Sequence, residues 1–119
     1  MSRPAPLSGI RILDLTRLLP GPVATLHLAD LGAEVIKIED FEAGDYARTL
    51  GTGSGEDSAY FRMINRNKQG IRLDLKKAEG VAVFMRLVRD ADVVIESFRP
   101  GVVDKLGIGY AAVSAVNPK

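Results

Sequence analysis

The chain has 119 residues, of which 46% are apolar and 26% are charged, and its net charge at pH 7 is +1. This composition is typical of one globular domain, and the balanced charge gives no reason to expect nucleic acid or an anionic membrane surface as a partner. The chain has no cysteine, which excludes disulfides, and with a single histidine we expect no metal site. No apolar run reaches about 18 residues, which argues against a membrane span. We therefore expect a cytoplasmic protein.

The first third of the chain has the pattern strand, helix, strand. The apolar run Ile10–Leu15 predicts a short strand that is buried on both faces. Pro20–Pro22 should break the chain, after which the apolar spacing predicts a helix over Val23–Leu31. Gly32 follows at the position where helices commonly end in a left-handed glycine. Val35–Ile38 predicts a second buried strand.

The remainder continues the alternation of strands and helices. Glu39–Ser58 is polar and rich in glycine, and its length indicates a functional or mobile loop. Ala59–Ile64 is apolar and is compatible with either a helix or a strand. A strand, a helix, a strand and two helices are then expected at Gly70–Leu75, Ala78–Ala91, Asp92–Glu96, Pro100–Leu106 and Tyr110–Val116. This order predicts an α/β fold with a mainly parallel sheet and flanking helices.

The β-α-β start raises the possibility of a dinucleotide site, but the first loop argues against NAD or FAD. Such a site needs a G-x-G-x-x-G turn that lets the pyrophosphate approach the backbone at a helix N-terminus. Here the loop Thr16–Pro22 has one glycine and two prolines, and each proline removes an N–H that a phosphate would need. The glycine-rich stretch Gly51–Gly55 also lacks the Gly-Lys-Ser/Thr of a P-loop.

Three other groups of residues have both a functional and a structural interpretation. His27 could be a general base, but no motif places a partner acid, so an ordinary helix residue is favoured. Asp45 and Arg48 could share one turn, either as a local salt bridge or in a loop that orders over a ligand. Asn65–Lys68 is a dense group of polar side chains, or simply a solvated turn before a strand.

Cations recur near the ends of the later predicted strands. Lys76 follows the third strand, and Arg99 and Lys105 follow the fourth. Ligands of open α/β sheets bind at the carboxyl ends of the strands, so these cations suit the phosphates of a coenzyme. The alternative is that they form a solvated face.

Taken together, the residues resemble a known family. The chain is similar to the N-terminal part of class III (CaiB/BaiF-type) CoA-transferases, the group that includes formyl-CoA and carnitine CoA-transferases and α-methylacyl-CoA racemases. The resemblance is carried in order by Leu7–Ile10, Asp14–Thr16, Gly21–Pro22, Leu31–Glu39, Gly44–Asp45, Asn65–Lys68, Leu73–Lys76, Phe98–Gly101, Leu106–Gly107 and Asn117–Pro118. At position 40, where relatives often have a basic residue or proline, this chain has Asp40.

The resemblance implies a fold, a carrier and a partner. Residues 1–119 would be the N-terminal CoA-binding part of a Rossmann-like large domain, with the small domain and the catalytic segment absent. The ligand would be CoA or acyl-CoA, and the full-length parent would be an interlocked homodimer. By position, contacts with CoA would come from Leu19, Pro20, Leu73, Asp74, Leu75, Lys76, Ser97, Phe98, Arg99 and Lys105.

The resemblance also implies the chemistry of the parent, a transfer of CoA between carboxylic acids. In the transferases a catalytic aspartate forms anhydride intermediates with the acyl group, whereas the racemases move a proton with a His and an Asp. In both, the motif follows the segment matched here, so no catalytic residue is assigned. The alternatives are part of an α-methylacyl-CoA racemase, or a non-catalytic CoA-binding or interaction module. We also expect the isolated chain to be weakly stable or to self-associate through an open sheet edge.

Overall fold

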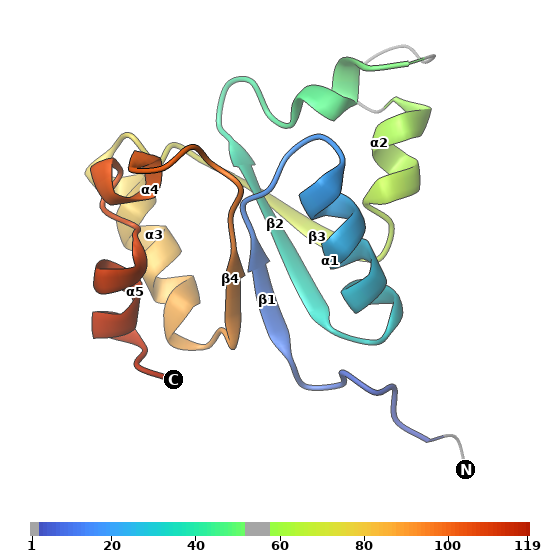
Figure 1. The fold of residues 1–119 in the computed structure, drawn as a ribbon, viewed down its shortest axis with the longest axis horizontal. Helices are drawn as coiled ribbons and strands as arrows, with labels where there is room; N and C mark the ends of the chain where they lie inside the picture. Colours follow the sequence, from blue (N-terminus) through green and yellow to red (C-terminus); the bar gives the residue numbers. More distant parts are fainter. Residues whose placement is uncertain (1–2, 52–57) are drawn as a thin grey trace.

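The computed structural model describes residues 3–51 and 58–119. Its centre is a sheet of four parallel strands in the spatial order β3-β2-β1-β4 (Figure 1). The strands are β1 (Arg11–Asp14), β2 (Glu34–Asp40), β3 (Lys68–Leu73) and β4 (Val93–Ile95). The chain winds outward from β1 to β3 and then returns to place β4 on the other side of β1. This is the order of a Rossmann-like sheet, so the predicted α/β fold is confirmed.

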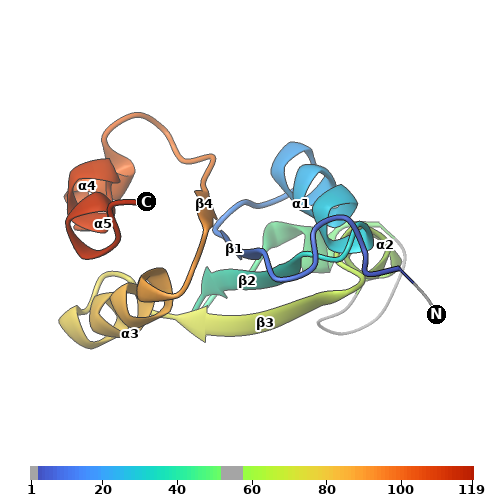
Figure 2. The same ribbon diagram turned by 90° about the horizontal axis from the view of Figure 1, so that it is seen from below.

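Helices cover both faces of the sheet. In the described residues they are α1 (Pro20–Asp30), the 3-10 helix η1 (Tyr46–Thr49), α2 (Ala59–Ile64), α3 (Ala78–Arg89), α4 (Val102–Lys105) and α5 (Tyr110–Val116). Figure 2 shows α1 and α2 on one face and α3, α4 and α5 on the other. None of the helices in the described ranges is long and apolar enough to cross a membrane.

The alternation of side chains along β1 divides the core into two parts. Ile12 points to the face covered by α1, and Leu13 points to the face covered by α3, as the period of two in a strand requires. The larger core, on the α3 face, consists of Leu13, Leu15, Ile38, Leu73, Phe84, Val88, Ala91 and Ile108. The smaller core, on the α1 face, consists of Ile12, Ala29, Ala33 and Val35. A third, small apolar cluster of Ala47, Phe61 and Ile64 lies beside α1, and buried polar side chains fill much of the rest of that face.

Helix α1 begins three residues earlier than predicted and ends at Asp30, one residue before its predicted end. Pro20–Pro22 does not break the chain but forms the first turn, where the N–H groups have no partner within the helix and prolines are tolerated. Leu31 caps the C-terminus, and Gly32 follows with a φ of 101°. This confirms the expected left-handed glycine, since that backbone conformation strains any residue with a Cβ.

The third strand is displaced from its predicted position. It runs from Lys68 to Leu73 rather than from Gly70 to Leu75. Its partner β2 ends at Asp40, which lies opposite Leu73, so the pairing stops there. The apolar alternation continues to Leu75 because that side chain packs against the α3-side core beyond the end of the strand. Lys76 therefore lies in the loop before α3 rather than at the strand end.

The segment that was compatible with a helix or a strand is the helix α2. The hydroxyl of Ser58 accepts a hydrogen bond from the N–H of Phe61 at 3.1 Å, which caps the helix N-terminus. Within the predicted loop Glu39–Ser58, β2 continues to Asp40 and η1 forms one short turn, while residues 52–57 lie outside the described residues.

Asn117 joins the C-terminal end of α5 to the end of α3. Its side-chain amide donates to the carbonyl oxygens of Val88 and Ala91, each at 2.9 Å. The carbonyl of Val88 also accepts from the N–H of Ala91, so the side chain adds a bond to a carbonyl that closes α3 and bonds the carbonyl of Ala91 just beyond it. Asn117 therefore anchors α5 against α3.

Candidate functional site

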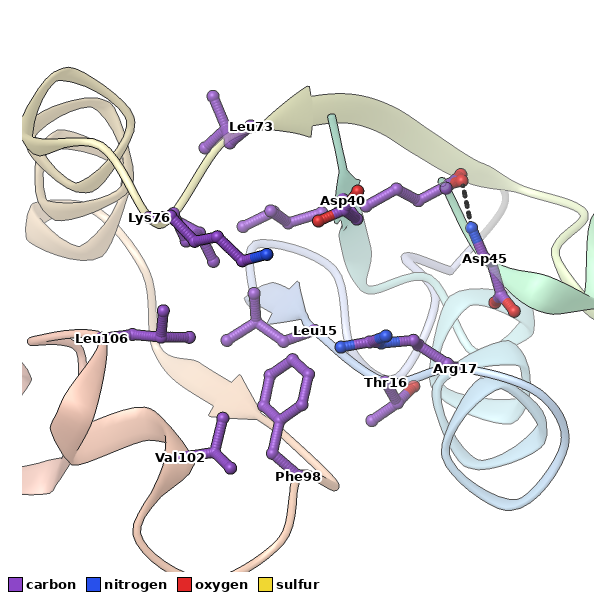
Figure 3. Close-up of a pocket in the computed structure, with 14 residues that line it drawn as sticks. Leu15, Thr16, Arg17, Asp40, Asp45, Leu73, Lys76, Phe98, Val102 and Leu106 are labelled. Atoms are coloured by element: carbon purple, nitrogen blue, oxygen red, sulfur yellow. Dashed lines mark hydrogen bonds between the residues drawn. The ribbon is translucent and has the colours of Figure 1, made fainter. Parts of the chain in front are cut away.

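A cavity of about 170 Å³ opens at the carboxyl ends of the strands. Every strand contributes to it: Leu15 follows β1, Asp40 ends β2, Leu73 ends β3, and Phe98 lies in the segment after β4. Figure 3 shows these side chains around the cavity. This crevice is where ligands bind in open α/β sheets, and it includes the point between β1 and β4 at which the strand order reverses.

The cavity combines an apolar lining with two cations. Leu15, Leu73 and Phe98 provide apolar surface. Arg17 and Lys76 point into the cavity from opposite sides (Figure 3). Three carboxylates also line the cavity, those of Glu39, Asp40 and Asp45. Glu39 and Asp45 are paired with cations outside the cavity lining, so Arg17 and Lys76 can still attract a ligand that carries both an apolar part and a negative charge.

An open groove of about 860 Å³ adjoins this cavity between α3 and α4. The two spaces share Leu75, Lys76, Val102 and Leu106. The groove adds two more cations, Lys77 and Lys105, so three lysines line it in all. The apolar cavity therefore opens directly into a region of positive charge.

The ten predicted CoA-contact residues are distributed unevenly around these spaces. Leu73, Leu75, Lys76 and Phe98 line the cavity, and Lys105 lines the groove. Asp74 lines a smaller groove beside α3. Leu19, Pro20, Ser97 and Arg99 are exposed and line none of these spaces. Of the three cations expected together, Lys76 and Lys105 share the groove and Arg99 does not.

The loop between β1 and α1 is held in place by hydrogen bonds to a buried ion pair. Lys37 on β2 lies with its Nζ 2.7 Å from Oδ2 of Asp45, and these side chains are only 2% and 1% exposed. The same Nζ donates to the carbonyl oxygen of Thr16 at 3.0 Å. Oδ1 of Asp45 accepts from the N–H of Leu18 at 3.0 Å. We call this arrangement the Lys37–Asp45 clamp, because it holds the peptide groups on both sides of Arg17.

Neighbouring charges hold the clamp itself. Glu39 accepts from the N–H of Asp45 at 2.8 Å, the bond drawn in Figure 3, and forms an ion pair with Arg48 at 2.6 Å. Burial alone would raise the pKa of Asp45, but hydrogen bonds from Lys37 and from two backbone N–H groups outweigh it and hold the pKa below its usual value. The pKa of Glu39 is lowered against burial in the same way, chiefly by Arg48. Both carboxylates are therefore charged at neutral pH.

A second buried polar group surrounds Asp14 at the end of β1. Its carboxylate accepts from the hydroxyls of Thr16 and Thr25 and lies 3.4 Å from Nζ of Lys68. Burial lowers the pKa of Lys68 to about 8, although the charge of Asp14 partly opposes this shift. Nζ of Lys68 also donates to the carbonyl oxygen of Pro22 at 2.9 Å, so this group ties β3 to the start of α1.

No pattern in the sequence predicted the Lys37–Asp45 clamp. Lys37 and Asp45 were seen only as members of motifs, because their pairing depends on which face of the sheet α1 covers. The one signal available was a lysine and a glutamate on one side of an otherwise apolar strand. Arg17 was also missed, since no pattern predicted that its loop would point it into a cavity.

Two of the three other candidate groups have structural partners. Asp45 and Arg48 do share one turn, but each has an ion-pair partner on β2, Lys37 for Asp45 and Glu39 for Arg48. In Asn65–Lys68, Arg66 and Asn67 bind the carboxylate of Asp30 at the end of α1. His27 is exposed on α1.

Comparison with known proteins points to one family. The family model described as CoA-transferase family III matches residues 7–119. An acetyl-CoA:oxalate CoA-transferase of Acetobacter aceti is 46% identical over 114 residues, covering 96% of this chain and 29% of that protein. The human succinyl-CoA:glutarate CoA-transferase is 44% identical over 119 residues, covering 99% and 27%.

A solved structure agrees with these sequences. A CAIB/BAIF family protein from Brucella suis superposes with a TM-score of 0.89 at 41% identity, covering 97% of this chain and 32% of that chain. The chain thus spans less than a third of the length of these relatives. Their similarity nevertheless extends along nearly all of it, and the resemblance inferred from the motifs is confirmed: the chain belongs to CoA-transferase family III.

Proposed function

We propose that this chain supplies part of the CoA-binding site of an enzyme that transfers CoA between carboxylic acids. The observation that carries the proposal is the apolar cavity at the strand ends, which opens into a groove lined by Lys76, Lys77 and Lys105. CoA has the matching shape, an apolar thiol arm joined to a nucleotide that bears several phosphates. The relatives named as CoA-transferases support the same assignment.

In this proposal the groove holds the phosphates and the cavity holds the arm. The lysines neutralise phosphate charge through charge-assisted hydrogen bonds. Lys105 acts as a point charge rather than a bidentate partner. Leu73, Leu75, Lys76 and Phe98 lie along the same path. The groove volume of about 860 Å³ is within the range of cofactor sites.

The chemistry and the assembly of the whole enzyme are part of the proposal. CoA would pass between an acyl-CoA donor and a free carboxylic acid, and we assign no catalytic residue to this chain. The parent would act as the interlocked homodimer that the family resemblance implies. The names of two relatives include oxalate or glutarate as the acid, which makes dicarboxylic acids the first acceptors to test.

Titration calorimetry of the full chain with CoA and with 3′-dephospho-CoA tests the binding part. We expect micromolar binding that weakens about 10- to 100-fold in Lys76→Ala, because one charge-assisted hydrogen bond contributes about 1.5–3 kcal/mol. Lys119→Ala is the matched control, since Lys119 is 71% exposed and pairs with Asp92 away from the groove. Equal CoA affinity in both variants would contradict the proposal.

The transfer part is tested separately with radiolabelled succinyl-CoA and oxalate or glutarate as acceptor. Transfer by the longest available form of the protein, with none in the 119-residue chain, fits a chain that carries only part of the site. Binding of CoA without transfer in either form would support the alternative of a non-catalytic CoA-binding module and would contradict the transfer part.

A further inference from the structure

Arg17 lines the strand-end cavity, and its guanidinium lies against two aromatic rings. Its guanidinium carbon is 4.8 Å from the ring centre of Phe98 and 5.5 Å from that of Tyr46. Both distances are within the range of cation–π contacts, and guanidinium groups stack well on aromatic faces. The two rings come from different segments, one after β4 and one in η1, so Arg17 links the two sides of the cavity mouth.

The backbone around Arg17 is fixed more firmly than an ordinary loop. The Lys37–Asp45 clamp binds the carbonyl before it and the N–H after it. Leu18 has a φ of 68°, a left-handed conformation that is uncommon for a residue with a side chain and that the hydrogen bond to Asp45 helps to hold. The clamp therefore fixes the backbone from which the Arg17 side chain projects, and the contacts with Phe98 and Tyr46 hold its guanidinium, which together lower the entropy cost of using it.

The charges of the cavity leave its two cations without ion-pair partners. Its acids are engaged elsewhere: Glu39 with Arg48, Asp45 with Lys37, and Asp40 with the N–H groups that follow it in its own turn. Within residues 3–51 and 58–119, neither Arg17 nor Lys76 forms an ion pair. The cavity thus presents two unpaired positive groups on an apolar lining.

We propose that Arg17, whose backbone is held by the Lys37–Asp45 clamp and whose guanidinium lies against Phe98 and Tyr46, binds an anionic group of the ligand together with Lys76. The anionic group is a phosphate or a carboxylate, because each presents two oxygens on one central atom, and a guanidinium can bind both oxygens through two hydrogen bonds. This inference rests on the proposed function for the ligand that brings the anion, but the anion site stands on the residues of the cavity alone.

The carboxylate of Asp40 lies in the same cavity as Arg17 and Lys76 and opposes the binding of an anion. The N–H of Ala43 lowers the pKa of Asp40 most, and Lys76 and Arg17 add to that effect through their charges. Asp40 therefore carries a negative charge in the same cavity as the two cations and weakens their attraction for an incoming anion. Removing the charge of Arg17 and removing the charge of Asp40 should change anion affinity in opposite directions.

The experiment measures the affinities of the full chain and its variants for CoA, pantetheine, pyrophosphate and oxalate. We expect Arg17→Gln to weaken binding of the anion that uses the site by about 10-fold or more. Arg17→Lys should recover only part of this loss, because it restores the charge without the stacked, two-pronged geometry. Asp40→Asn should strengthen binding severalfold, since its amide oxygen still accepts from the turn N–H groups. Arg86→Gln, an exposed cation on α3 outside the cavity, should change nothing.

The ligands distinguish the source of the anion. Dependence of CoA and pyrophosphate binding on Arg17, with oxalate unaffected, supports a phosphate; the reverse pattern supports a carboxylate. If wild-type protein does not bind CoA but binds oxalate in an Arg17-dependent way, the proposed function fails and this inference stands. If CoA binds and Arg17→Gln leaves all the affinities within twofold of wild type, this inference is overturned while the proposed function stands.

Discussion

Replacing Lys37 by Met separates the two halves of the clamp with little change in shape. The variant leaves the carboxylate of Asp45, which is 1% exposed, without its counterion. Removing one partner of a buried ion pair costs about 3–5 kcal/mol, because the other charge stays buried and unbalanced. The carbonyl of Thr16 also loses its hydrogen bond from Nζ. Against a typical total stability of about 5–15 kcal/mol, Lys37→Met should remove a large fraction.

A second substitution should restore part of the loss. In the double variant Lys37→Met/Asp45→Asn the position is neutral, and the amide oxygen can still accept from the N–H groups of Leu18 and Ala47. We expect it to be more stable than Lys37→Met alone by about 2 kcal/mol, since the unbalanced charge is gone. Lys119→Met is the matched control on the surface, where loss of an exposed ion pair costs about 0–1 kcal/mol.

Urea unfolding followed by circular dichroism measures these differences. With an m-value of about 1–3 kcal/mol/M, a loss of about 3 kcal/mol lowers the midpoint by about 1–3 M. A cost below about 1 kcal/mol for Lys37→Met, or a double variant no more stable than the single one, would falsify the view that the clamp is a tight buried ion pair.

The stability difference between the wild type and Lys37→Met should also depend on pH, in a direction set by the pKa of Asp45. In the wild type the pKa of Asp45 lies below its usual value, so its contribution is complete above the pKa of the unfolded chain, about 4, and is lost as the pH falls through the lower folded value. In Lys37→Met, burial without a counterion raises the pKa of Asp45, and protonation then removes the free-energy cost of its buried, unpaired charge. The stability gap between the two proteins should narrow as the pH falls towards 4.

Three further predictions concern packing, capping and base titration. Gly80→Ala should destabilise the chain by about 1–3 kcal/mol, because the new Cβ would lie 2.0 Å from a carbonyl oxygen of the loop before α3, whereas Gly70→Ala, which meets nothing within 4 Å, should cost much less in the same urea assay. Asn117→Ala should cost about 1–3 kcal/mol by removing the two amide hydrogen bonds that join α5 to the segment at the end of α3, against about 0.5 kcal/mol or less for Ser114→Ala on the same helix. Burial places the pKa of Lys68 at about 8, below its usual 10.5. Between these two values the unfolded chain binds more protons than the folded chain, so the free energy of unfolding should rise with pH in that range. Lys68→Met should lack this rise, and a Lys68→Met variant whose stability changes with pH as the wild type's does would refute the buried position.

The strands and their parallel order could be predicted because each depends on local signals. Ile12 and Leu13 show the burial of β1 on both faces directly, and the alternation of strands and helices fixes the class of sheet. The end of β3 could not be predicted in the same way. Leu75 continues the apolar pattern, and only the end of β2 opposite Leu73 determines where the pairing stops.

The site was predicted in outline, because its place at the strand ends follows from the fold class alone. Its internal arrangement depends on contacts between residues far apart in sequence. Lys37 and Asp45 hold a loop about 20 to 30 residues before them, and Leu18 adopts a left-handed conformation that propensity disfavours. No local pattern carries that information, which is why Arg17 was found only in the folded chain.

The two faces of the sheet are stabilised by different physics. On the α1 face, paired carboxylates and amines add to a small apolar core, whereas the larger core of the α3 face consists of hydrocarbon contacts such as those of Phe84 and Val88. Acid removes charge and so loosens the first face, and cooling weakens apolar association and so loosens the second. A single sheet four strands wide therefore has two separate routes to partial unfolding, and the stress applied decides which layer of helices detaches first.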